Sequence, residues 1–253
     1  MEKKILVIGD SCIDSYAYCR STRLAPDKPV PVLEVLDTVN TPGMAYNVFR
    51  NVVSLTKFPK GIDLLTNERY EDVVKTRYVD AFSNHMFMRV DSVVNIDRIK
   101  DNNIKDGYDT VIISDYDKGF LTVEDIEYIC TNHPQVFLDT KKILGNWANA
   151  ARFIKINNHE YERSKDYFQN TNVQDRVIQT MGSEGCYFNG KQYPVEQAEV
   201  MDLSGAGDTF MAALAVKYTE TEDIDSSITY ANSCASKVVK KRGTTVVLSL
   251  IHI

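Results

Sequence analysis

The segment Asp202 to Phe210 (DLSGAGDTF) places small residues and acids at the start of a predicted helix. Gly205, Ala206 and Gly207 leave the first amide groups of that helix accessible, and the helix dipole favours an anion there. We therefore predict a phosphate-binding turn. An acid in this turn would repel a phosphate, so its presence needs a function. Accepting a proton from an attacking hydroxyl group is such a function, which makes Asp208 a candidate general base. The alternative is that Asp208 only caps the helix.

Short apolar runs bounded by turn residues predict buried strands around this segment. Lys4 to Asp10 is the first of them and should lie centrally, because its β-branched residues suit a strand that is covered on both faces. The others are Thr110 to Ser114, Val136 to Asp139, Phe153 to Asn157 and Arg176 to Met181. Helical patterns separate several of these runs, so we predict an α/β fold with a mostly parallel sheet. Helices are expected at Ala206 to Tyr218 and at Ile224 to Lys241, packed on one another.

Two stretches interrupt this alternation and predict a small β flap. Pro29 to Val35 alternates apolar and polar residues, as do Lys75 to Asp80 and His85 to Asp91, with short polar links. The prolines at 26, 29 and 31 favour an edge position for the first flap strand, because proline cannot donate a hydrogen bond.

Composition excludes several classes of protein. The 253 residues carry a formal net charge of −6, which argues against a nucleic-acid coat or a partner of anionic membranes. Apolar runs stay far below the ~18 residues that span a bilayer, and the N-terminus lacks a signal-peptide pattern. We therefore expect a cytoplasmic protein. The five cysteines and four histidines show neither disulfide nor metal-ligand spacing, so reduced thiols are expected. No P-loop or dinucleotide-binding glycine motif occurs.

Further polar blocks follow the predicted strands and helices in a fixed order. They are Ile8-Gly9-Asp10 with Asp14, Pro42 to Asn47 (PGMAYN), Ser114 to Gly119 (SDYDKG), Leu138 to Lys141 (LDTK), Asn157 to Glu160 (NNHE), Thr180-Met181-Gly182 and Ala231-Asn232. Together with Asp202 to Phe210 they resemble the motifs of the ribokinase-like (PfkB) carbohydrate kinases. The resemblance implies a three-layer α/β/α sandwich over residues 1–253, as a single kinase domain, with a β lid from about 15–40 and 75–92.

The resemblance also implies roles for individual residues. Asp208 would be the base, and the amides of Gly205, Ala206 and Gly207 would neutralise the transferring phosphoryl group. The residues implied to bind the sugar are Asp14, Gly43, Asn47, Arg89 and Lys118. Those implied on the ATP side are Asn157, Glu160, Thr180, Gly182 and Asn232, with Glu160 also near Mg²⁺.

Each of these roles has a structural alternative. Asn157 and Glu160 could cap a helix, Asp14 could be a turn residue, and Asn47 could be a buried polar residue. The basic side chains could be solvated charges or clamps for a sugar phosphate, and this applies to Lys75, Arg77, Arg89 and Lys118.

Within the family, the chain is most similar to heptose 7-phosphate kinase domains. Asp27 to Val32 (DKPVPV) and Met88 to Asp91 (MRVD) carry this similarity, with Lys75 to Arg77 upstream. It implies transfer of the γ-phosphoryl group of ATP to the anomeric hydroxyl of D-glycero-D-manno-heptose 7-phosphate, and a homodimer formed through the flap. The alternatives are another PfkB-type sugar or nucleoside kinase, or a catalytically impaired relative that binds a sugar or nucleotide.

The chain also departs from the family pattern. Met44 replaces the second of two adjacent glycines, which restricts the backbone where the lid would close. Between Leu55 and Lys75 the chain is about thirty residues shorter than the resemblance implies, with Thr56 to Lys60 in place of a strand, a turn and a helix. The chain ends soon after the last predicted helix, so we expect no fused nucleotidyltransferase domain.

Overall fold

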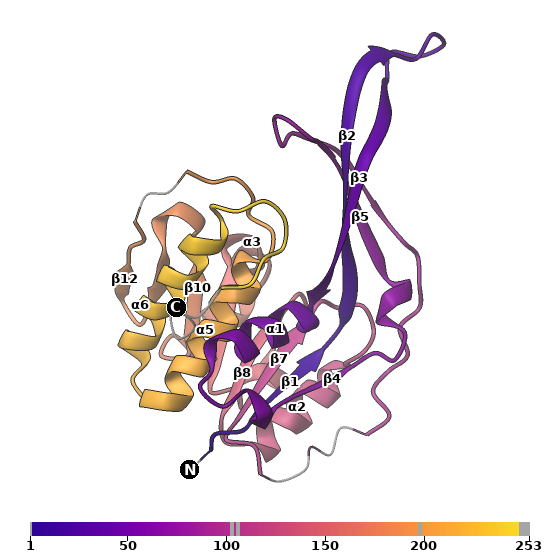
Figure 1. Cartoon of the computed structure of the whole chain (residues 1–253). Helices are drawn as coiled ribbons and strands as arrows, with labels where there is room; N and C mark the ends of the chain where they lie inside the picture. The colour runs from indigo at the N-terminus through magenta and orange to yellow at the C-terminus, as the bar shows by residue number, and fades with distance from the viewer. Residues whose placement is uncertain (1, 102–103, 105–106, 197–198, 248–253) are drawn as a thin grey trace.

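A mostly parallel sheet forms the centre of the molecule (Figure 1). The computed structural model describes residues 2–247 except 102–103, 105–106 and 197–198. In these residues the strands are ordered β12-β11-β10-β9-β8-β7-β1-β4, and only β11 and β12 run antiparallel to their neighbours. Their bounds are β1 Ile5–Gly9, β4 Ile62–Thr66, β7 Thr110–Asp115, β8 Val136–Thr140, β9 Phe153–Asn157, β10 Val177–Thr180, β11 Cys186–Phe188 and β12 Lys191–Tyr193. The predicted α/β class is confirmed.

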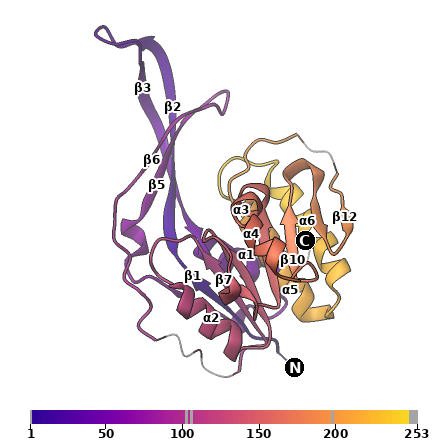
Figure 2. The same ribbon diagram turned by 180° about the vertical axis from the view of Figure 1, so that it is seen from behind.

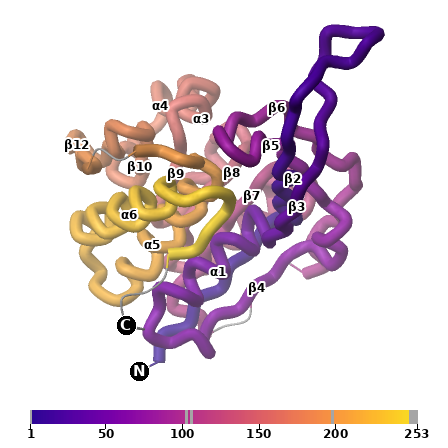
Figure 3. Tube along the Cα trace, turned by 45° about the horizontal axis from the view of Figure 1, so that its top comes forward, coloured from indigo at the N-terminus to yellow at the C-terminus, as the bar shows by residue number. Residues whose placement is uncertain are grey.

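Helices cover both faces of this sheet because its strands are apolar on both sides. Along β1, Ile5 and Val7 pack into one core while Leu6 and Ile8 pack into the other. The first core is closed by α1 Ala45–Leu55, α5 Ala206–Thr221 and α6 Ile224–Val238, which lie side by side in Figure 3. The second is closed by α2 Val123–Asn132, α3 Asn158–Arg163 and α4 Lys165–Asn170, seen from behind in Figure 2. Short 3₁₀ turns complete the elements: η1 Pro59–Gly61, η2 Tyr70–Asp72, η3 Asn146–Ala148 and η4 Gly182–Glu184.

A separate four-stranded sheet projects from the sandwich (Figure 1). Its order is β3-β2-β5-β6, with bounds β2 Ser11–Leu24, β3 Pro31–Met44, β5 Val74–Asp80 and β6 Met86–Asp91. β3 is an edge strand, as its prolines predict. The projecting part of β3 exposes Val35, Leu36 and Val39. Only Asp10 separates β1 of the central sheet from β2 of this second sheet.

The shortened region between Leu55 and Lys75 differs from the sequence-based expectation. A strand was expected to be missing there, but β4 is present and pairs in parallel with β1. β4 lies at the edge of the sheet, and among its five residues only Ile62 is buried. An edge strand needs few apolar residues, so the sequence of β4 carries too weak an apolar pattern to predict a strand. The expected absence of a helix does hold, since residues 67–73 form turns and η2. A cavity of about 370 Å³ lies beside this segment, lined also by residues 94–101 and by none of the predicted site residues.

Two sequence-level expectations concern the whole chain. All five cysteines are free and buried, which confirms the expectation of reduced thiols. In the part of the chain that the structure describes, no helix combines the length and the apolar character that crossing a membrane requires.

Candidate active site

The turn before α5 brings backbone amides to the carboxyl-terminal edge of the central sheet. Gly205 precedes the helix with φ 79° and ψ 0°, a left-handed conformation that glycine adopts without strain. A side chain at Gly205 would also meet the Asn47 amide nitrogen at 2.9 Å. Ala206 N already donates to Leu203 O at 3.2 Å, whereas the amides of Gly205 and Gly207 donate to no backbone oxygen of the described residues, which makes them candidates for an anion.

Asp208 lies in the first turn of α5 and is only 5% exposed. Its two carboxylate oxygens accept hydrogen bonds from Asn47 Nδ2 at 2.9 Å and from Tyr116 Oη at 2.5 Å. Burial raises the pKa of Asp208, while these two hydrogen bonds act in the opposite direction. A carboxylate that is buried, oriented by two donors and raised in pKa has the properties of a general base.

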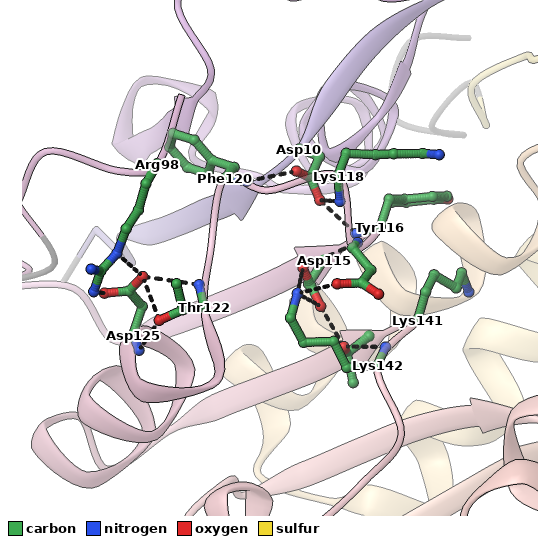
Figure 4. Close-up of polar contacts among 12 residues, drawn as sticks. Asp10, Arg98, Asp115, Tyr116, Lys118, Phe120, Thr122, Asp125, Lys141 and Lys142 are labelled. Atoms are coloured by element: carbon green, nitrogen blue, oxygen red, sulfur yellow. Dashed lines mark hydrogen bonds and ion pairs between the residues drawn. The ribbon is translucent and has the colours of Figure 1, made fainter. Parts of the chain in front are cut away.

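A buried aspartate holds the loop that carries Tyr116 (Figure 4). Asp10 is fully buried directly after β1, and its carboxylate accepts from the backbone amides of Tyr116 at 2.7 Å and Phe120 at 3.2 Å. The central strand β1 thereby fixes the loop, and the loop fixes the phenol that bonds to Asp208. Burial raises the pKa of Tyr116 well above its usual range, so its hydroxyl remains a donor.

The predicted sugar residues Asp14 and Gly43 lie against each other where the second sheet joins the sandwich. A side chain on Gly43 would meet Asp14 Oδ2 at 2.2 Å, so only glycine fits beneath this carboxylate. Arg77 Nη1 donates to Asp14 Oδ1 at 2.6 Å, and Thr244 Oγ1 donates to Asp14 Oδ2 at 3.4 Å. Asp14 is therefore more than a turn residue, because two distant segments orient its carboxylate.

A buried chain of charges runs from the start of α5 towards the nucleotide-side residues. Lys155 Nζ forms an ion pair with Asp139 at 2.8 Å, and it lies 3.2 Å from the position that a side chain on Gly207 would occupy. Lys141 forms ion pairs with Asp139 and Glu160. Burial acts to raise the pKa of Asp139, but Lys155 and Lys141 outweigh it and hold that pKa below its usual value. The two lysines and the two carboxylates neutralise one another, and Lys155 Nζ is the charged atom of the cluster that lies next to the turn before α5.

Glu160 is held by the chain itself. Asn157 and Glu160 form a reciprocal capping box at the start of α3, in which Glu160 Oε2 accepts from Asn157 N at 2.9 Å and the other oxygen accepts from Lys141. The described residues contain no group of three acids, histidines or cysteines arranged around a metal position. Such a donor set fits Mg²⁺ that arrives on a nucleotide and keeps its waters, and it does not form a separate metal cage.

The remaining predicted nucleotide residues lie further along the sheet. Thr180 pairs with Asn157 at the ends of adjacent strands β10 and β9, and Gly182 follows in η4 with open space around its α-carbon. Asn232 is buried on α6 and donates to Tyr193 O at 2.9 Å, so this donor binds the protein backbone.

The two predicted clamps Arg89 and Lys118 are exposed. Arg89 holds the carboxylate of Asp91 through two bonds of 2.6 Å. The Lys118 side chain extends away from Asp10 in Figure 4.

Sequence reasoning missed two residues that the structure places next to Asp208. Tyr116 lies in the Ser114 to Gly119 block but was given no role of its own. Its position directly after a buried strand is a signal, because such a residue can reach a site at the carboxyl-terminal edge of the sheet. Lys155 was a clearer signal, because a lysine within the apolar strand Phe153 to Asn157 must find a buried partner. Neither residue could be paired with its partner without the fold.

Comparison with known proteins agrees with this geometry. The model for the "pfkB family carbohydrate kinase" matches residues 78–250. The chain belongs to the pfkB family of carbohydrate kinases. This confirms the family resemblance and makes the chain a member of a family of phosphotransferases that act on sugar hydroxyl groups.

Relatives of this pfkB kinase include proteins named "Bifunctional protein HldE". The one from Helicobacter pylori strain J99 is 30% identical over 295 residues, covering 96% of this chain and 64% of the relative. The one from Helicobacter hepaticus is 30% identical over 309 residues, covering 98% of this chain and 64% of the relative. The chain thus spans somewhat less than two thirds of the length of these relatives.

Solved structures support the fold. Ribokinase from Thermotoga maritima superposes with a TM-score of 0.69 at 15% identity, over 96% of this chain and 94% of that one. Phosphofructokinase-2 from Escherichia coli in complex with potassium gives a TM-score of 0.71 at 14% identity, over 97% and 95% of the two chains. The ribokinase-like architecture predicted from the sequence is confirmed.

Proposed function

We propose that this pfkB kinase transfers the γ-phosphoryl group of ATP to the anomeric hydroxyl of a phosphorylated sugar such as D-glycero-D-manno-heptose 7-phosphate. The observation that carries the proposal is the placement of Asp208 beside the free amides of the α5 turn, with Asn47 and Tyr116 orienting its carboxylate. The heptose assignment is supported by the Asp27 to Val32 motif and by the similarity to HldE proteins.

In the proposed reaction each group acts on a defined atom. Asp208 accepts the proton of the sugar hydroxyl, using lone pairs that its bonds to Asn47 and Tyr116 leave free. The amides of Gly205 and Gly207 stabilise the charge that develops on the transferring phosphoryl oxygens, a contribution of ~3 kcal/mol for a well-placed donor. Lys155 Nζ lies next to Gly207, and its ion pair with Asp139 fixes its position there. Asp14, oriented by Arg77 and Thr244, binds a second hydroxyl group of the sugar.

The nucleotide and the metal occupy the other half of the site in this proposal. Asn157, Thr180, Gly182 and Asn232 line the ATP side, and Glu160 would contact Mg²⁺ through water. Bound in this way, Mg²⁺ would supply positive charge that offsets the negative charge of the nucleotide phosphates. Residues 1–253 act as one kinase domain, and the second sheet serves as a lid that excludes water from the sugar. The exposed apolar side chains of that sheet support its use as a homodimer contact.

The test is a substrate panel with a matched base variant. ADP release is measured with ATP and Mg²⁺ against heptose 7-phosphate, ribose, fructose 6-phosphate and adenosine, for the wild type and Asp208→Asn. We expect heptose 7-phosphate to give the highest kcat/KM. In Asp208→Asn, kcat should fall by ~10² or more while nucleotide affinity changes by no more than several-fold.

Two results would change the assignment. Undiminished turnover in Asp208→Asn would reject Asp208 as the base. Sugar binding without any phosphoryl transfer by the folded wild type would instead favour the impaired, binding-only relative.

A further inference from the structure

Lys75 is a buried cation in the second sheet, next to the candidate active site. It lies on β5 opposite Asp14 of β2 and Asp91 of β6, and it is only 7% exposed. Its ammonium group lies 5.0 Å from the centroid of the Tyr116 ring, and the hydroxyl of that ring bonds to Asp208. A single aromatic side chain thus connects the ammonium group to the candidate base.

The other buried or half-buried lysines of the site have carboxylate partners. Lys155 pairs with Asp139, Lys141 with Glu160, and Lys142 with Asp115. Among the described residues, no carboxylate lies within 4.0 Å of Lys75 Nζ. Lys75 is the exception in a site where positive charge is otherwise neutralised.

The acids nearest to Lys75 are already bound by other groups. Arg89 holds both oxygens of Asp91, which faces Lys75 across the β5–β6 pair. Arg77 holds Asp14, on the opposite neighbouring strand. The two basic residues of segment 75–77 therefore divide their tasks: Arg77 orients a carboxylate, and Lys75 has none.

The hydrogen-bond partner that Lys75 does have is a weak one. Its Nζ lies 2.7 Å from Met44 Sδ, and a thioether is a poor acceptor for an ammonium group. Met44 itself is strained, with φ 61° and ψ −131°, a conformation that is rare for any residue with a side chain. Its buried side chain packs with Cys12 and Val73, so apolar groups lie beside the ammonium group of Lys75. A desolvated cation without an anionic partner favours an anion that enters with a ligand.

We propose that Lys75 is the specificity-determining residue for an anionic group on the sugar, a phosphate monoester. The inference rests on the proposed function and deepens it, because it assigns the phosphate of the substrate to one side chain.

The test measures binding without turnover. Calorimetric titration in the absence of ATP compares heptose 7-phosphate with unphosphorylated heptose, and fructose 6-phosphate with fructose. Lys75→Met removes the charge at nearly constant volume. Lys60→Met makes the same change at an exposed position in η1, away from the site, and serves as the control.

We expect the wild type and Lys60→Met to bind the phosphorylated form of at least one pair more tightly than the neutral form. In Lys75→Met this preference should fall about tenfold or more, as the loss of a charged hydrogen bond predicts, while affinity for the neutral sugar stays within about threefold. An unchanged preference in folded Lys75→Met would overturn the proposal.

Two further results test the role of Lys75. Lys75→Gln replaces Lys75→Met if the latter does not fold, and the same loss of preference is expected. Equal affinity of the wild type for both members of each pair overturns the proposal without any variant. Because no turnover is needed, a wild type that prefers sugar phosphates but transfers no phosphoryl group refutes the kinase assignment and leaves the role of Lys75 supported.

Discussion

Replacing Tyr116 by phenylalanine tests whether the short bond to Asp208 sets the protonation of the candidate base. Tyr116 Oη donates at 2.5 Å, within the range of charge-assisted O–H···O⁻ bonds. This bond lowers the pKa of Asp208 against the raising effect of burial. Removing it must therefore raise the pKa further, and the base form is then lost at a higher pH.

The size of the shift follows from the bond. A hydrogen bond to a charged group contributes about 1.5–3 kcal/mol, and about 1.36 kcal/mol corresponds to one pKa unit. Asn47 still donates to the other oxygen of Asp208, so we take the lower end and expect about one unit. The acid limb of kcat/KM in Tyr116→Phe should move up by about one pH unit, with kcat within a few-fold of wild type above the limb.

The assay is the pH profile of kcat/KM from ADP release. Tyr108→Phe is the matched control, because it removes a tyrosine–aspartate bond of 2.8 Å to Asp63, outside the site. That variant should leave the acid limb in place. An acid limb in Tyr116→Phe that is unchanged or moves to lower pH would contradict the effect of this hydrogen bond on the pKa of Asp208.

Three other predictions follow from single contacts. Gly43→Ala places a β-carbon 2.2 Å from Asp14 Oδ2, so the KM for the sugar should rise about tenfold or more while the KM for ATP stays unchanged. An unaltered KM for the sugar would contradict the role of Asp14. Lys155→Met leaves the buried Asp139 with only Lys141 as a partner, at 3.5 Å, so the free energy of unfolding measured in urea should fall by about 3 kcal/mol. Most of this loss should be recovered when Asp139 is also replaced by leucine. A loss below about 1 kcal/mol would be inconsistent with the ion pair. Burial raises the pKa of the Cys12, Cys130 and Cys186 thiols to about 12. Ellman's reagent at pH 8 should therefore react slowly with the native protein and rapidly with five thiols after denaturation. Fast labelling of the native protein would disprove the burial of the thiols.

The sequence predicted the elements that have strong local patterns. Three such elements formed where the sequence predicted them: β1 within Lys4 to Asp10, β9 at Phe153 to Asn157 and α5 from Ala206. The two strands are buried on both faces, and Gly205 marks the start of the helix. No local pattern indicated β2, because Ser11 to Leu24 mixes serines, cysteines and charges, and only the family resemblance placed lid strands from about residue 15. The strand forms through pairing with β3 and β5.

The candidate site was predictable only as separate motifs. The helix-start geometry indicated Asp208, and the family resemblance indicated Asp14 and Asn47. The contacts that give these residues their chemistry join distant segments, as Asn47 and Tyr116 do at Asp208. Such pairings depend on the topology of the sheet, which local sequence patterns do not determine.

The single residue between β1 and β2 has a mechanical consequence. A sheet that is attached through a flexible linker can rotate while the rest of the molecule stays still, but here β1 of the sandwich continues into β2 of the second sheet after Asp10 alone. Rotation of the outer sheet must therefore be absorbed at Asp10 itself or at the other attachments of that sheet. Since the carboxylate of Asp10 also anchors the loop of Tyr116, a tilt of the second sheet at Asp10 would displace the phenol that donates to Asp208.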